Sequence, residues 1–162
     1  MIVLVGFMGA GKTTVGRILA GRLGLPFVDS DLAIEQRLGR PVRQVFETDG
    51  EAFFREVEHA TIRDLLQGPD AVVALGGGAL GDARTRAALG DATVVYLEVS
   101  FAGAVERVGG DRGRPMLHRP GLEELHAERV AAYRGAASIT VDTGGRTPPA
   151  VADELLRLLT AD

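Results

Sequence analysis

Residue types that bind phosphate and magnesium occur together near the start of the chain. Residues 6–14 read Gly-Phe-Met-Gly-Ala-Gly-Lys-Thr-Thr, the glycine, lysine and hydroxyl spacing of a phosphate-binding loop. Glycines let the backbone wrap closely round a phosphate with its N–H groups pointing inward. Lys12 would contact the outer phosphates, and the Thr13 hydroxyl would ligate a magnesium ion that bridges them. The stretch predicts a P-loop for a nucleotide, with contacts from Gly9, Ala10, Gly11, Lys12, Thr13 and Thr14.

Lys12 is the only lysine in the chain of 162 residues. A composition biased toward arginine explains why lysine is scarce. It does not explain why the one lysine stands where a compact ammonium suits the loop better than a planar guanidinium. The chain also contains no asparagine, so it lacks the N-K-x-D motif with which regulatory GTPases read guanine. The phosphate acceptor must therefore be identified from other residues.

Two carboxylates follow the short apolar run 25–28, which we expect to be a strand. Of Asp29 and Asp31, one would hold magnesium-bound water, and the other would orient or deprotonate an acceptor hydroxyl. The strand expected at 71–75 ends in glycine, so it offers no carboxylate of its own for the metal. Asp31 has an alternative interpretation, because an aspartate at the start of a helix is a common N-cap.

Two arginines are candidates for holding a carboxylate of the acceptor. Arg55 stands near the start of a long expected helix with Glu58 three residues on, so an ion pair within the helix is the alternative. A guanidinium fork suits bidentate capture of a carboxylate, and Arg134 at the end of another helix would be its partner. Backbone N–H groups of Gly77 and Gly78 would add contacts, although a glycine triplet also suits a tight turn.

A glycine-rich and charged stretch, residues 109–115, is a candidate for a mobile loop above the phosphates. Arg114, with Arg112 or Arg107, would stabilise the charge that develops during transfer and would exclude water when the loop closes. A solvated charged loop is the alternative interpretation.

The elements that position these residues alternate along the chain. Apolar runs predict strands at 1–5, 25–28, 71–75, 93–99 and 139–141. Helical spacing predicts helices at 14–23, 32–38, 48–67, 82–89 and 101–108. A further helix is expected along the stripe Leu122, Leu125, Arg129 and Tyr133, and a last one from 147. Such alternation indicates an α/β fold with a parallel sheet and helices on both faces. Ligands of such sheets bind beyond the carboxyl ends of the strands. The glycine loop, the two aspartates and the glycine triplet should therefore converge at one edge.

Composition narrows the class of protein further. The length and the 46% of hydrophobic residues suit one domain with a sizeable core. The net charge of -4 argues against a general nucleic-acid binder. The absence of cysteine excludes disulfides and thiolate metal sites. We see neither an export signal nor an apolar run long enough for a membrane span, so we expect a cytoplasmic protein.

Taken together, these stretches resemble the shikimate kinases, small members of the nucleoside monophosphate kinase-like group of P-loop folds. The resemblance covers nearly the whole chain and rests on residues 6–14, 29–31, 34–37, 46–58, 76–78, 114–115, 133–134 and 141–143. It implies a three-layer α/β/α P-loop kinase fold with a central five-stranded parallel sheet. The single domain would span residues 1–162, with a shikimate-binding helical segment at about 31–62 and a mobile lid at about 109–120.

The resemblance implies a role for each candidate residue. Asp31 would bind and deprotonate the acceptor hydroxyl, and Asp29 would support magnesium through water. Lys12 and Arg114 would act on the phosphates during catalysis. The implied contacts with shikimate are Asp31, Arg55, Glu58, Gly76, Gly77, Gly78 and Arg134, and the further implied contacts with ATP are Arg107, Arg114, Arg146 and Pro148.

The implied reaction is the ATP-dependent phosphorylation of shikimate at its 3-hydroxyl, which gives shikimate 3-phosphate and ADP in aromatic amino-acid biosynthesis. The enzyme would use Mg²⁺ and would be a monomer. One rival is another small-molecule P-loop kinase, such as a gluconate kinase, and the set of Asp31, Arg55 and Arg134 argues against it. The other rival is a nucleotide-binding module without catalysis, and Lys12 together with Arg114 argues against that.

Overall fold

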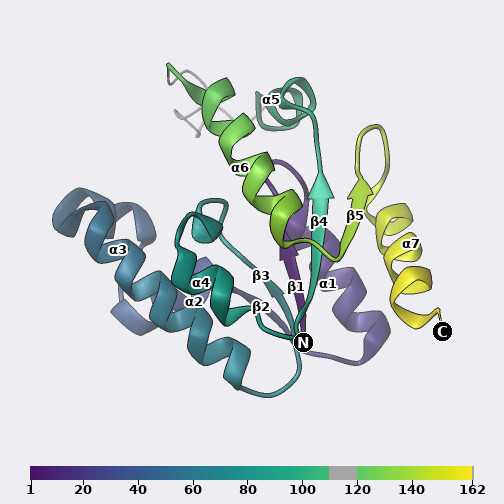
Figure 1. Ribbon diagram of the computed structural model, residues 1–162, viewed down its shortest axis with the longest axis horizontal. Helices are drawn as coiled ribbons and strands as arrows, with labels where there is room; N and C mark the ends of the chain where they lie inside the picture. The colour runs from purple at the N-terminus through teal and green to yellow at the C-terminus, as the bar shows by residue number, and fades with distance from the viewer. Residues whose placement is uncertain (110–119, 162) are drawn as a thin grey trace.

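Five short strands form one parallel sheet at the centre of the computed structural model, which describes residues 1–109 and 120–161 (Figure 1). The strands lie in the order β2-β3-β1-β4-β5, and every neighbouring pair is parallel. Their bounds are β1 Ile2–Val5, β2 Phe27–Asp29, β3 Val72–Ala74, β4 Thr93–Glu98 and β5 Ile139–Asp142. The five predicted strands are thus confirmed, and β1 lies in the middle of the sheet.

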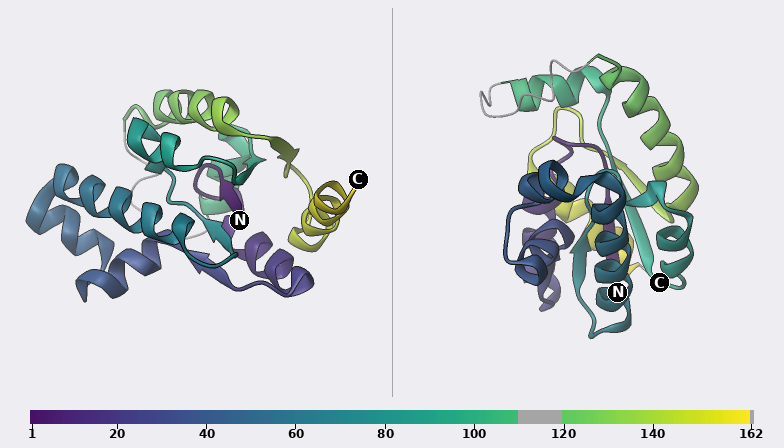
Figure 2. Two further views of the ribbon diagram at one scale, coloured as in Figure 1. Left: turned by 60° about the horizontal axis from the view of Figure 1, so that its bottom comes forward. Right: turned by 90° about the vertical axis from the view of Figure 1, so that its left-hand side faces the viewer.

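Helices cover both faces of this sheet. They are α1 Lys12–Leu23, α2 Ser30–Leu38, α3 Val42–Gln67, α4 Ala83–Ala88, α5 Phe101–Gly109, α6 Leu122–Ala136 and α7 Pro148–Thr160, with a short 3₁₀ turn, η1, at Ala79–Gly81. Figure 2 shows α1 and α7 on one face and α4 and α6 on the other, while α2 and α3 extend beyond the β2 edge. The three-layer α/β/α arrangement is therefore confirmed.

The apolar runs form strands because both of their faces are buried. Val3 and Leu4 of β1 are fully buried, and so are Val72 and Val73 of β3. A strand covered by helices on both sides needs apolar residues throughout rather than alternation with polar ones. These strands join the helices in one large core.

A second, smaller core lies between α2 and α3. It consists of Ile34, Val45 and Phe54, which are buried together and apart from the large core. The helical segment beyond the sheet edge is therefore packed mainly by its own side chains.

Helix α3 begins earlier than the sequence indicated. Its first residue is Val42, whereas the pattern at residues 48–51 suggested a start near Thr48. Gly50, with a φ of 85° and a ψ of 171°, is not helical, and it divides α3 into two helical segments joined at a kink. Glycine adopts this conformation readily, whereas other residues are strained in it. The pattern at residues 48–51 therefore coincides with the start of the second helical segment, which runs to Gln67, and the first segment, from Val42, was not predicted.

The segment proposed as a lid, residues 109–120, falls almost entirely outside the described residues, and Arg112 and Arg114 fall there too. Among the described residues, no helix combines the length and the apolar character needed to cross a membrane.

Candidate active site

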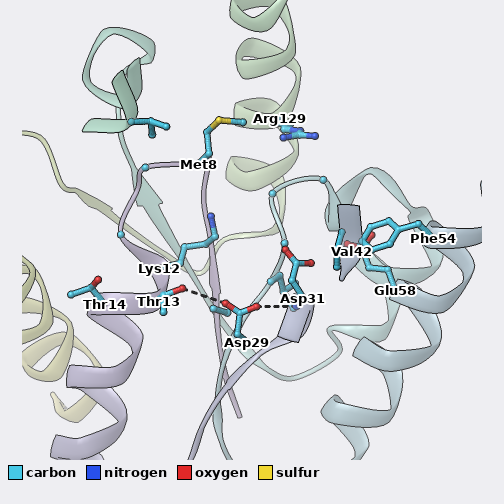
Figure 3. Close-up of a pocket in the computed structure, with 18 of the residues that line it drawn as sticks. Met8, Lys12, Thr13, Thr14, Asp29, Asp31, Val42, Phe54, Glu58 and Arg129 are labelled. Atoms are coloured by element: carbon cyan, nitrogen blue, oxygen red, sulfur yellow. Dashed lines mark hydrogen bonds between the residues drawn. The ribbon is translucent and has the colours of Figure 1, made fainter. Parts of the chain in front are cut away.

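A pocket of about 650 Å³ opens where the carboxyl ends of β1, β2 and β3 meet (Figure 3). Three groups of predicted site residues line it together: the glycine loop, the two aspartates and the glycine triplet. The lining includes Gly9, Gly11, Lys12, Thr13, Thr14, Asp29, Asp31, Arg55, Glu58, Gly76, Gly77, Gly78 and Arg107. Apolar side chains of Val42, Phe46 and Phe54 and the guanidinium of Arg129 complete the wall. The predicted convergence at one edge of the sheet is therefore confirmed.

The glycine loop has a conformation that only glycine adopts without strain. Gly9 and Gly11 have φ values of 81° and 91°, in the left-handed region. Gly11 is the N-cap of α1 and has no side chain to cap it, so the first N–H groups of the helix are available to an anion. The ammonium of Lys12 donates to the carbonyl of Gly6 at 2.6 Å and to that of Phe7 at 3.2 Å. The loop is thus folded round its own lysine, and Ala10 is buried beneath it.

Asp29, rather than Asp31, caps helix α2. Its Oδ1 accepts the backbone N–H of Asp31 at 2.9 Å and that of Leu32 at 3.4 Å, and its Oδ2 accepts the hydroxyl of Thr13 at 3.3 Å (Figure 3). The N-cap interpretation of Asp31 was therefore wrong. Because Asp29 serves as the cap, the carboxylate of Asp31 is left to face the pocket.

Burial sets the electrostatics of Asp31. Removal of its carboxylate from water raises its pKa, and the negative charge of Asp29 adds to this effect. The positive charges of Lys12 and Arg55 act in the opposite direction but do not cancel the shift. Asp31 is therefore a stronger base than an exposed aspartate, and it lies beside the phosphate loop.

The three glycines of the triplet make room for three charged side chains. A Cβ atom on Gly76 would lie 2.7 Å from Oδ1 of Asp31, and one on Gly78 would lie 2.6 Å from Nη2 of Arg55. A Cβ on Gly77 would lie 3.2 Å from Nη1 of Arg129. None of the three has a positive φ. Close approach, and not the shape of a turn, therefore explains why the segment is all glycine.

Arg55 is held by an acidic partner on its own helix. Its Nη1 lies 2.7 Å from Oε1 of Glu58, and the Glu58 side chain is 3% exposed. Burial raises the pKa of Glu58, and the hydrogen bond from Arg55 works against that shift. The guanidinium also lies 5.2 Å from the ring centroid of Phe54. The predicted helical ion pair exists, but it lies inside the pocket rather than on the surface.

The structure brings Arg129 to the pocket instead of Arg134. Arg134 points away: its side chain is 63% exposed and pairs with Glu98 at 2.8 Å. Five residues separate the two arginines on α6, which turns them about 140° apart round the helix axis. The sequence held a signal for this, because Arg129 shares the buried helical stripe of Tyr133 and Arg134 does not. We predicted Arg134 from its place at the end of a helix and from the family resemblance at residues 133–134, and neither of these identifies the helix face that meets the pocket.

Of the residues predicted to hold adenine, one lines the pocket and two do not. Arg107 lines the pocket and donates to the carbonyl of Gly9 and to the hydroxyl of Thr143, each at 3.0 Å. Arg146 and Pro148 do not line it: Arg146 pairs with Glu154 at 2.5 Å, and Pro148 begins α7.

The pocket combines a phosphate loop at a helix start, two carboxylates at the end of the next strand and two arginines. This combination defines a P-loop phosphotransferase for a small anionic acceptor. The family model described as shikimate kinase matches residues 8–160. The chain belongs to the shikimate kinase family.

Individual relatives agree with this assignment. The shikimate kinase of Mycobacterium avium is 48% identical over 98% of this chain and 93% of its own length. The shikimate kinase of Thermobifida fusca is 46% identical over 99% and 95%. Among solved structures, shikimate kinase from Acinetobacter baumannii in complex with shikimate has a TM-score of 0.88 at 37% identity, covering 98% of this chain and 91% of that one. A gluconokinase from Sinorhizobium meliloti has a TM-score of 0.63 at 23% identity, with 97% and 91% covered, and shares the fold alone.

Proposed function

We propose that the protein transfers the γ-phosphoryl group of ATP to the 3-hydroxyl of shikimate and releases shikimate 3-phosphate and ADP. The observation that carries this proposal is the position of Asp31. Its half-buried carboxylate lies in one pocket with the phosphate loop and with Arg55 and Arg129. A hydroxyl next to Asp31 can therefore face the γ-phosphate while a carboxylate of the same molecule reaches the arginines.

The phosphates of ATP would lie against the loop, with its N–H groups and Lys12 as donors. A magnesium ion prefers hard oxygen ligands, and the Thr13 hydroxyl and the Asp29 carboxylate, 3.3 Å apart, offer such oxygens beside the loop. These residues fit the ion, with Asp29 acting directly or through water. When bound, magnesium supplies positive charge that neutralises the phosphates.

The carboxylate of shikimate would be held by Arg55 and Arg129. Their guanidinium groups both lie beside the same glycine, since a Cβ on Gly78 would be 2.6 Å from Arg55 and 3.0 Å from Arg129. Such paired forks match the geometry of a carboxylate. The N–H groups of Gly77 and Gly78 have no acceptor within the described residues, so they are available to the same ligand. Glu58 would keep Arg55 in place.

The chemical step follows from these positions. Asp31 accepts the proton of the 3-hydroxyl as the oxygen attacks the γ-phosphorus, and the bond from that phosphorus to the bridging oxygen of ADP breaks. The positive charge of Lys12 stabilises the negative charge on the transferring group. We propose that Arg114 and Arg107 act from the nucleotide side, Arg114 from the segment outside the described residues. Catalysis is then mostly positioning and charge stabilisation.

We further propose that the enzyme works as a single domain and as a monomer in the cytoplasm, with no nucleic-acid partner. The net charge of -4 supports the last of these points. The single five-stranded sheet supports the first.

A coupled assay of ADP release tests the proposal. With ATP and magnesium, we expect turnover with shikimate and only background with gluconate or with nucleoside monophosphates. Absence of turnover with shikimate would contradict the proposal. Turnover with gluconate alone would favour the rival kinase, and ATP binding without turnover of any acceptor would favour a non-catalytic module.

A further inference from the structure

Two buried hydroxyl groups, one on α2 and one on α6, bind the backbone of the glycine triplet. The backbone N–H of Gly76 donates to Oγ of Ser30 at 3.0 Å, and the hydroxyl of Tyr133 donates to the carbonyl of Gly77 at 2.5 Å. Ser30 is 0% exposed and Tyr133 is 1% exposed. Neither hydroxyl lines the pocket of the reaction, so neither can contact the substrates there.

The triplet needs to be held because it sets the spacing of the charged groups around it. Asp31, Arg129 and Arg55 each pack against one glycine so closely that a single Cβ would collide or force a shift. A displacement of the triplet would therefore change where the proposed base and the two arginines stand relative to one another. Misplacement of reacting groups by about 1 Å is enough to slow an enzyme by about two orders of magnitude.

Each hydroxyl belongs to an element that carries one of these groups. Ser30 stands between Asp29 and Asp31 at the start of α2. Tyr133 follows Arg129 by four residues on α6, and residues four apart lie on the same face of a helix. The two hydrogen bonds thus connect the aspartate segment and the arginine helix to the same loop.

We propose that Ser30 and Tyr133 are positioning residues that fix the glycine triplet in the geometry that binds shikimate. The proposal rests on the acceptor role given above to the triplet and to Arg129. Ser30 fixes the triplet to α2 and Tyr133 fixes it to α6, so that Asp31 and the two guanidinium groups keep their relative places.

The substitution Tyr133→Phe tests the proposal because it removes one hydroxyl and leaves the ring packed against Tyr96, with ring centroids 5.2 Å apart. We expect KM for shikimate to rise about two- to tenfold, as for the loss of one hydrogen bond. We expect KM for ATP to stay within about twofold, because the phosphate loop is held by other bonds. The control is Tyr96→Phe, the same change at a tyrosine that is also 1% exposed, which should alter neither value.

The variant Ser30→Ala should act in the same direction, and the double variant should raise KM for shikimate by less than the product of the two single effects, because both bonds hold one loop. A simple product would contradict the shared role. The proposal would also be overturned if Tyr133→Phe changed KM for shikimate and KM for ATP equally, or if it lowered the melting temperature alone. The same effect from Tyr96→Phe would overturn it too.

Arg129→Ala separates this inference from the proposed site on which it rests. If Arg129→Ala leaves KM for shikimate unchanged, the acceptor site is misplaced and the inference falls with it. If Arg129→Ala raises that KM and Tyr133→Phe does not, the acceptor site stands and the positioning role is wrong.

Discussion

The half-buried carboxylate of Asp31 lowers the stability of the folded protein when it is ionised. Because the folded state raises its pKa above 3.8, the folded protein binds this proton more tightly than the unfolded chain does. Stability therefore falls as the pH rises from the unfolded pKa through the raised folded one. Above that window the ionised carboxylate remains unfavourable to folding. It is the ionised form, however, that can accept a proton from a hydroxyl.

We predict that Asp31→Asn lowers kcat by roughly 10²- to 10⁴-fold, as expected for loss of a general base, and raises the melting temperature at neutral pH. The gain should shrink as the pH falls and be absent below about 3.8, where the native aspartate is protonated too. Assays of ADP release and thermal unfolding across pH check both parts. A melting temperature that drops at neutral pH would mean that the carboxylate stabilises the fold.

The two arginines of α6 provide a matched pair of substitutions. Arg129→Ala should raise KM for shikimate on the order of 10- to 100-fold, because charge-assisted hydrogen bonds to the carboxylate are lost. Arg134→Ala removes only an exposed pair with Glu98, so its effect should lie within about twofold. Steady-state kinetics with shikimate varied at saturating ATP measures both. Equal effects of the two variants would refute our placement of the acceptor.

At the scale of elements, the kink at Gly50 divides α3 into two helical segments. Gly50→Ala should destabilise the protein by about 1–3 kcal/mol, because the backbone conformation there is strained for other residues. A Cβ at this position meets nothing within 4 Å, so the effect would report on the backbone alone. The control is Gly21→Ala in α1, where a Cβ is equally unobstructed, and there we expect about 1 kcal/mol of stabilisation. Urea unfolding gives both values.

The positions of the elements were more predictable from the sequence than the directions of side chains. Continuous apolar runs such as 71–75 identify buried strands, and the order of elements then places their ends at one edge. Which face of α6 meets the pocket depends on packing against the triplet, so Arg134 was chosen where Arg129 lies. The sequence also left an N-cap role open for Asp31, because the two carboxylates are two residues apart and only hydrogen-bond geometry shows that Asp29 is the cap.

Across the whole molecule, the sheet order separates the residues proposed to bind the two substrates. The central strand β1 leads to the phosphate loop, while β2 and β3 lead to the aspartates and the triplet. On the opposite side, β4 and β5 lead to Arg107 and Thr143, which lie at the expected nucleotide end. In the proposed function, donor and acceptor would therefore meet above the middle of the sheet.

The small core of Ile34, Val45 and Phe54 packs α2 against the first part of α3, on the proposed acceptor side. We predict that Val45→Ala, which removes two methyl groups from a fully buried side chain, costs about 2 kcal/mol. Hydrogen exchange should accelerate in α2 and α3 while β1 and β4 keep their protection. KM for shikimate should rise and KM for ATP should not. Uniform acceleration over the whole chain would show that the two cores unfold together.

The tyrosine pair, Tyr96 and Tyr133, is also a source of intrinsic fluorescence. The chain has two tyrosines and no tryptophan, so tyrosine emission comes entirely from Tyr96 and Tyr133. Both rings are buried side by side, and the hydroxyl of Tyr133 is bonded to the glycine triplet. Emission from a tyrosine depends on the partner of its hydroxyl. We therefore predict that the tyrosine emission of the unlabelled protein changes when it is titrated with shikimate. Tyr133→Phe should remove that change in emission.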